Sequence, residues 1–119
     1  MIRQFIVVAA LILFGLAPAQ AAGALAVGTC GAYGEAHDFP NASAARASAL
    51  RECRGQGCKV VANLRGNCAA YAVDSANPCG MSAHASGPHL GKAQNAALRA
   101  CYSTGGKDCV IRVFVCDGR

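Results

Sequence analysis

The sequence contains no tryptophan, and two of its four phenylalanines, Phe5 and Phe14, lie within the first 21 residues. Most of the remaining apolar residues are alanine and valine, and 14 residues are glycine. A chain of this composition buries little apolar area per residue, so we expect a thin hydrophobic core. This shortage excludes a fold held together by large aromatic side chains, and it requires a second source of stability.

No apolar run in the chain has the length of a membrane span. The longest, from Phe5 to Leu16, has 12 residues, whereas a span needs roughly 20. It follows Arg3 and precedes Ala19-Gln20-Ala21, which is the order of regions in a cleavable signal peptide. We therefore expect residues 1–21 to be removed after Ala21. The alternative is an uncleaved membrane anchor, which the short run and Pro18 disfavour.

The expected mature chain, residues 22–119, is long enough for one domain and too short for two with separate large cores. Residue 22 is alanine rather than the cysteine that would carry a lipid. We therefore predict a soluble monomer without a membrane span, either periplasmic or secreted.

Clustered charge and ligand-like spacing are also missing. The mature chain has a net charge of +4, and its basic residues are scattered instead of forming the stripe that nucleic-acid binding requires. The three histidines, including His89 after Pro88, are dispersed and give no metal-ligand spacing. We expect no nucleic-acid partner, metal or cofactor.

What the mature chain does have is cysteine. All eight cysteines follow Ala21: Cys30, Cys53, Cys58, Cys68, Cys79, Cys101, Cys109 and Cys116. An even number in an exported chain predicts four disulfides, which would supply the stability that the core lacks. Zinc is the competing interpretation, but the spacings lack the tight two-residue knuckles of structural zinc sites.

The second half of the chain repeats the first. Ala49-Leu50-Arg51-x-Cys53 recurs as Ala97-Leu98-Arg99-x-Cys101, and Cys30-Gly31 recurs as Cys79-Gly80. The offsets, 48 and 49, differ by no more than a loop-length change would produce. Because the cysteines align as well as the alanines, we infer an internal duplication, with repeats at about 24–66 and 67–117.

Each repeat predicts strand, strand, helix and strand. The first pair of strands is expected at 24–27 and 31–37, and the second at 69–73 and 80–86. The helices are expected at 42–54, capped by Asn41 or Ser43, and at 90–102. β-branched runs that begin at Cys58 and Cys109 predict the last strand of each repeat. The predicted fold is α+β, with an antiparallel sheet packed by two Ala-rich helices around one shared core and stapled by disulfides.

The duplication also predicts how the cysteines pair, because equivalent cysteines should have equivalent roles. Cys53 and Cys58 are close in sequence and correspond to Cys101 and Cys109, so we predict Cys53–Cys58 and Cys101–Cys109. A residue near a twofold axis meets its own equivalent, which favours Cys30–Cys79 and leaves Cys68–Cys116. We expect both of these last bonds to join one repeat to the other.

The Ala-rich helix ending in Ala-Leu-x-x-Cys, followed by a cysteine that opens a Val-rich strand, resembles the bacterial exported family called domain of unknown function 4189. The resemblance rests on Ala49–Val61 and Ala97–Cys116 and extends over nearly all of the mature chain. It implies an exported α/β domain and carries over no activity and no catalytic residue. The sequence departs from the family pattern in its missing tryptophan and its additional Cys30 and Cys79.

One group of polar residues could support chemistry. Tyr33, Glu35 and His37 share one side of a predicted strand, while Ser82, His84 and Ser86 share the same side of its counterpart. Glu35 and His84 are equivalent under the duplication, and a carboxylate beside an imidazole can do acid–base work. A solvated strand face explains the same pattern, and it is the interpretation we favour because no orienting group or oxyanion site accompanies the pair.

We therefore assign no catalytic residue, and the sequence favours a binding module over an enzyme. The module would bind or inhibit a protein or an envelope component. The alternative is a small secreted hydrolase that uses the Glu35/His84 strand face.

Overall fold

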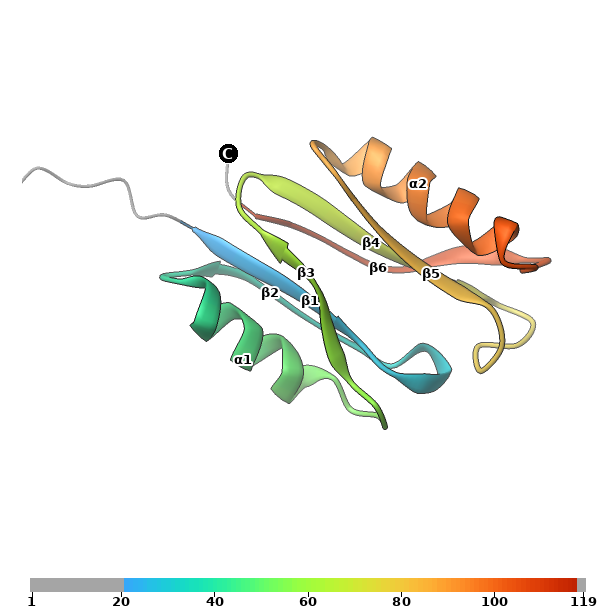
Figure 1. The fold of residues 1–119 in the computed structure, drawn as a ribbon, viewed down its shortest axis with the longest axis horizontal. Helices are drawn as coiled ribbons and strands as arrows, with labels where there is room; N and C mark the ends of the chain where they lie inside the picture. Colours follow the sequence, from blue (N-terminus) through green and yellow to red (C-terminus); the bar gives the residue numbers. More distant parts are fainter. Residues whose placement is uncertain (1–20, 118–119) are drawn as a thin grey trace, which may run out of the picture.

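The computed structural model describes residues 21–117, so the predicted signal peptide lies outside the described residues except for Ala21. Residues 21–117 fold as strand, strand, helix and strand, used twice (Figure 1). The first set is β1 (Ala22–Val27), β2 (Tyr33–Phe39), α1 (Ala42–Glu52) and β3 (Lys59–Leu64). The second set is β4 (Asn67–Asp74), β5 (Ser82–Gly87), α2 (Leu90–Ser103) and β6 (Cys109–Asp117). A short 3₁₀ turn, Thr29–Gly31, separates β1 from β2.

The α+β class is confirmed, but the strands form two sheets instead of one. The orders are β2-β1-β3 and β5-β4-β6, and every pairing is antiparallel. The pairing of β1 with β3 shifts register between Leu25 and Ala26, and that of β4 with β6 shifts between the equivalent Tyr71 and Ala72. The two repeats therefore share a β-bulge at the same position.

The two sheets stack face to face, and each helix covers the outer face of its own sheet (Figure 1). Successive side chains of a strand point to opposite faces of the sheet, and here the larger ones lie on one face and the alanines on the other. Leu25 and Val27 of β1, with Tyr71 and Val73 of β4, face inward and fill the layer between the sheets. The opposite faces present mostly alanine to the helices: Ala22, Ala24 and Ala26 toward α1, and Ala70 and Ala72 toward α2.

The two repeats thus share one central core layer, as expected, and each adds a thin layer between its own sheet and helix. The small side chains let each helix approach its sheet closely, and this is most evident at Gly34 of β2. A Cβ at Gly34 would collide with the Ala49 carbonyl oxygen of α1. The equivalent position in β5 is Ala83, so α1 approaches its sheet more closely there than α2 does.

The helices begin and end near their predicted residues. The Asn41 side chain caps α1 by accepting a hydrogen bond from the Ala44 N–H at 2.8 Å, which decides between Asn41 and Ser43. The helical stripe of Ala45, Ala49 and Cys53 is buried, as its spacing predicts. Neither helix of residues 21–117 is long and apolar enough to cross a membrane.

Four disulfides join the same cysteines that the duplication argument pairs. Cys53–Cys58 and Cys101–Cys109 each fasten the end of a helix to the start of the next strand. Cys30–Cys79 joins equivalent residues of the two repeats, with their Cα atoms 3.8 Å apart, as expected on a twofold axis.

The expectation that Cys68–Cys116 also joins the repeats is wrong. Cys68 opens β4, and Cys116 lies opposite it in β6, so this bond crosses two neighbouring strands of the second sheet. In the first repeat Ala22 stands at the position equivalent to Cys68, so the first sheet has no corresponding disulfide between neighbouring strands.

Candidate functional site

Glu35 and His84 occupy equivalent positions, and the structure does not bring them together. Glu35 lies opposite Leu25 and His84 opposite Tyr71, so both lie on the side of their sheet that faces the other sheet. Because β2 and β5 are outer strands, these positions are still solvated: Glu35 is half-buried and His84 is exposed. β2 contacts β6 of the other sheet, however, whereas β5 contacts β3. Glu35 and His84 therefore lie at opposite edges of the sandwich and line different hollows.

The β2/β6 edge is filled by side chains near Tyr33. The Arg112 guanidinium lies over the Tyr33 ring, 5.6 Å from its centroid, and its Nε donates a hydrogen bond to the Gly31 carbonyl oxygen at 3.3 Å. Farther along this edge, His37 Nδ1 lies 3.1 Å from Glu35 Oε2, and the hydrogen bond and charge of Glu35 raise the pKa of His37. These contacts leave a hollow of about 200 Å³ beside Phe114.

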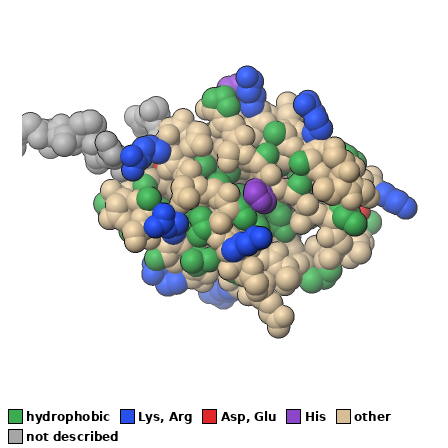
Figure 2. Space-filling view, in the orientation of Figure 1, with side chains coloured by type: hydrophobic (Ala, Val, Ile, Leu, Met, Phe, Trp, Pro, Cys, Tyr) green, Lys and Arg blue, Asp and Glu red, His purple; other side chains and the backbone are tan. Residues whose placement is uncertain are grey.

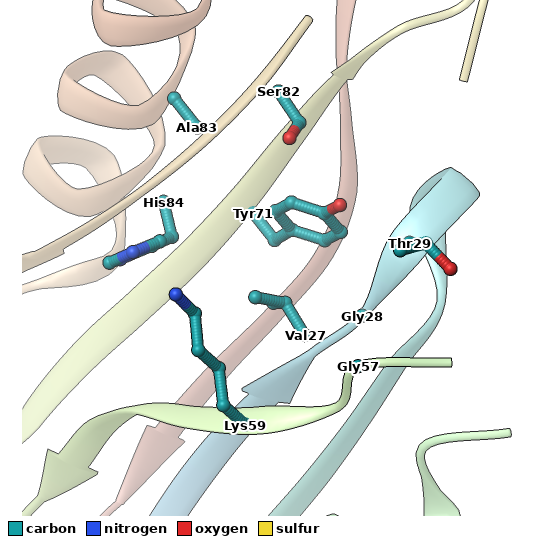
Figure 3. Close-up of a pocket in the computed structure, with 9 residues that line it drawn as sticks. All are labelled: Val27, Gly28, Thr29, Gly57, Lys59, Tyr71, Ser82, Ala83 and His84. Atoms are coloured by element: carbon teal, nitrogen blue, oxygen red, sulfur yellow. The ribbon is translucent and has the colours of Figure 1, made fainter. Parts of the chain in front are cut away.

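The β3/β5 edge is open. A cleft of about 320 Å³ lies between the repeats, floored by Val27 and the buried Tyr71. Figure 3 shows the ammonium end of Lys59 extending from β3 toward His84 of β5, with the Ser82 hydroxyl directed toward the Tyr71 ring. The remaining lining residues are Gly28, Thr29, Gly57 and Ala83.

The two edges differ because two residues differ. Ser82 stands where the first repeat has Tyr33, since each is paired with the last valine of the central strand, Val73 or Val27. At the bulge of β3, Val61 stands where β6 has Arg112. A ring and a guanidinium fill the first edge, whereas a hydroxyl and a short aliphatic side chain leave the second edge hollow.

The cleft is positive in character. None of its nine lining residues is acidic, and Lys59 contributes a full charge. Partial burial of the imidazole, and secondarily the nearby Lys59 charge, lower the pKa of His84. Both effects favour the neutral imidazole, which can donate a hydrogen bond from one ring nitrogen.

The surface around the cleft is also short of negative charge. Figure 2 shows Lys and Arg side chains spread over this face and almost no acidic side chain. Among residues 21–117, the ion pair that the structure contains is the one between His37 and Glu35. The basic side chains on this face are therefore available to an external anion.

The polar side chains around the cleft could bind an anion. An ammonium, an imidazole and a hydroxyl around one hollow can hold a carboxylate or a similar anion by charge-assisted hydrogen bonds. Within the described part of the chain, no group of three or more His, Cys, Asp or Glu residues is placed to hold a metal ion.

Sequence reasoning singled out Ser82 and His84 but missed Lys59 and Tyr71. Strand alternation could place the first two on one side of a strand. The stacking of β3 on β5, which brings Lys59 to His84, has no local sequence signal.

No curated protein and no solved structure matches the chain. One family model does match, and it covers residues 22–116, which is nearly the whole described domain. By that match, the chain belongs to the family described as domain of unknown function 4189.

Proposed function

We propose that the mature domain is an exported binding module that holds an anionic group of a protein or envelope component in the β3/β5 cleft. The observation that carries the proposal is the meeting of Lys59 and His84 around a hollow without an acidic lining residue. Most of the cleft is built on strands braced by disulfides, so its geometry is preorganised, which lowers the entropic cost of binding.

Export is supported by the four disulfides, which form and persist in oxidising compartments. A periplasmic or secreted monomer released by cleavage after Ala21 is part of the proposal. N-terminal sequencing of the protein recovered from its producing cell tests it, and a mature chain that retains residues 1–21 would refute it.

The hydrolase alternative, which requires Glu35 and His84 to work together, gains no support from the fold. The two residues lie at opposite edges of the sandwich, and each has other neighbours: His37 for Glu35 and Lys59 for His84.

The binding site is tested by titrating the ¹⁵N-labelled mature protein with glutarate, with neutral glutaramide as the matched probe. We expect saturable shifts at Lys59, Ser82 and His84 with glutarate and none with glutaramide. Lys59→Gln should abolish them, and so should Ser82→Tyr, which places a ring where the first repeat has one. Arg65→Gln, a charge-matched change outside the cleft lining, should leave them intact. Shifts spread evenly over all basic residues would refute the assigned cleft.

A further inference from the structure

The four outer strands of the two sheets differ in how they are protected against pairing with another chain. A sheet edge exposes unpaired N–H and C=O groups, and proteins guard such edges with charged side chains and bulges. β2 carries Glu35 and Asp38 and has a register shift in its pairing, and the pairings of β3 and β6 are shifted as well. β3 also carries Lys59, and β6 carries Arg112.

β5 has neither form of protection. It pairs with β4 in unbroken register from Ser82 to Gly87, and its sequence, Ser-Ala-His-Ala-Ser-Gly, contains no Asp, Glu, Lys or Arg. Its side chains are small except for His84, so they shield the backbone of its free edge little. By these two criteria β5 is the least protected of the four outer strands.

A second hollow lies along the same edge. It measures about 380 Å³ and is lined by Ser86 and Gly87 of β5 together with Lys92 and Arg99 of α2. Ser86 lies opposite Ala69, on the side of the sheet that faces the other sheet, whereas α2 covers the opposite side. The hollow therefore lies beside the end of β5, where the chain turns into α2.

Cations therefore lie at two places along this edge. Lys59 extends toward His84 in the cleft, and Lys92 and Arg99 lie near Ser86, farther along the strand. All three side chains are exposed. A second copy of this chain would bring the same cations against one another, which disfavours a β5–β5 dimer.

We propose that β5 and the groove beside α2 bind an extended acidic peptide, which pairs with the free edge of β5 and places carboxylates at Lys59 and at Lys92 and Arg99. Main-chain hydrogen bonds supply affinity in this mode of recognition, and the charged side chains supply selectivity. The inference rests on the proposed function, because it identifies the anionic partner of the cleft as a segment of protein chain.

The test uses the mature protein and a synthetic seven-residue peptide, Thr-Glu-Val-Asp-Glu-Thr-Val, blocked at both ends, whose acids point to both faces of the extended chain. One matched peptide carries N-methyl groups at alternate residues, so that it keeps its charge but cannot pair as a strand. Another replaces its acids with Gln and Asn. We expect only the unmodified acidic peptide to slow amide hydrogen exchange at alternate residues of 82–87.

Charge reversal then tests the groove. Lys92→Glu combined with Arg99→Glu should weaken peptide binding roughly tenfold, since it replaces two attractions by repulsions. Arg46→Glu with Arg51→Glu makes the same change in net charge on α1 and should weaken binding much less. Equal losses in the two double variants would show long-range attraction alone and would overturn the inference.

The remaining outcomes separate the two proposals. If glutarate binds the cleft but the N-methylated peptide binds as well as the unmodified one, strand addition is wrong and the proposed function stands. If neither glutarate nor any peptide binds, the proposed function fails as well. A doubled mass in solution, with protection of residues 82–87 in the absence of peptide, would identify a second copy as the occupant and overturn the inference.

Discussion

The two edges of the sandwich, β2/β6 and β3/β5, occupy equivalent places in the two repeats but differ in how their side chains fill them. At the first, Arg112 stacks on Tyr33 and the space is filled. At the second, Val61 and Ser82 leave a cleft that exposes Lys59 and His84. A duplicated domain offers each site twice, so one copy can be closed for stability while the other remains open for a ligand. Four predictions test this difference.

The largest expected loss of unfolding free energy concerns two disulfides, one that joins the repeats and one that lies within the first repeat. Replacing both Cys30 and Cys79 by Ala opens a loop of 49 residues and should cost about 4 kcal/mol of unfolding free energy, by the chain-entropy model. Removing Cys53–Cys58, which closes 5 residues, should cost about 2 kcal/mol. Denaturant unfolding of each double variant measures both values. Equal losses would mean that loop length does not govern the stability of this fold.

The Cys68–Cys116 pair sharpens this test. It closes 48 residues, nearly the same length, yet it lies within the second repeat. If joining the repeats matters beyond loop entropy, its removal should cost less than removal of Cys30–Cys79.

The next effect concerns how closely each helix packs on its sheet. Gly34→Ala places a Cβ against the backbone of α1 and should destabilise the fold by about 1–3 kcal/mol through overpacking. The reciprocal change in the second repeat, Ala83→Gly, should cost only about 0.5–1 kcal/mol, because it adds chain flexibility without a clash. Thermal or denaturant unfolding of the two variants compares them, and a harmless Gly34→Ala would show that α1 is no closer to its sheet than α2.

A smaller effect is expected at the closed edge. Arg112→Val gives β6 the residue that β3 has at the bulge, and it removes the contact with Tyr33 and the hydrogen bond to Gly31. Exposed cation–π contacts contribute about 0.5–1 kcal/mol, so we expect a loss of about 1 kcal/mol. Unfolding experiments measure the loss, and the variant should also gain a hollow beside Tyr33, visible in its crystal structure. An edge that stays filled would mean that Arg112 is not what closes it.

Much of this architecture could be predicted from the sequence, because its signals are local. Helix spacing, the Asn41 cap, strand alternation and the alignment of cysteines are each set within a few residues or by the repeat itself. The duplication predicts all four pairings, but the expectation that Cys68–Cys116 joins the repeats is wrong, because β4 and β6 are neighbouring strands of one sheet.

The division into two sheets and the cleft could not be predicted in this way. Both depend on how one sheet stacks on the other, which brings β3 beside β5 and β2 beside β6. Glu35 and His84 illustrate the limit: sequence equivalence suggested a shared site, whereas a twofold relation between the repeats places equivalent residues at opposite edges.

The smallest expected effect is a difference in pH dependence between the two edges. At the closed edge, Glu35 raises the pKa of His37, so the folded state holds that proton more tightly than the unfolded state does. The stabilisation of the folded state by protonated His37 is therefore fully present below about pH 6.5 and is lost as the pH rises through the raised pKa. At the open edge, partial burial and Lys59 lower the pKa of His84. Its contribution is present above about pH 6.5 and is lost as the pH falls toward the lowered pKa.

The two histidines therefore act on the pH slope of stability with opposite signs. Relative to the unmodified protein, His37→Gln should make the slope of unfolding free energy between about pH 5.5 and 7.5 more positive, and His84→Gln should make it more negative. Both side chains are substantially solvent-exposed, so screening keeps each change small. Urea titrations at several pH values, with the disulfides intact, measure the slopes. If the two variants changed the slope in the same direction, the inference that the two edges differ electrostatically would be wrong. The cleft would then not be a distinct, positively charged environment.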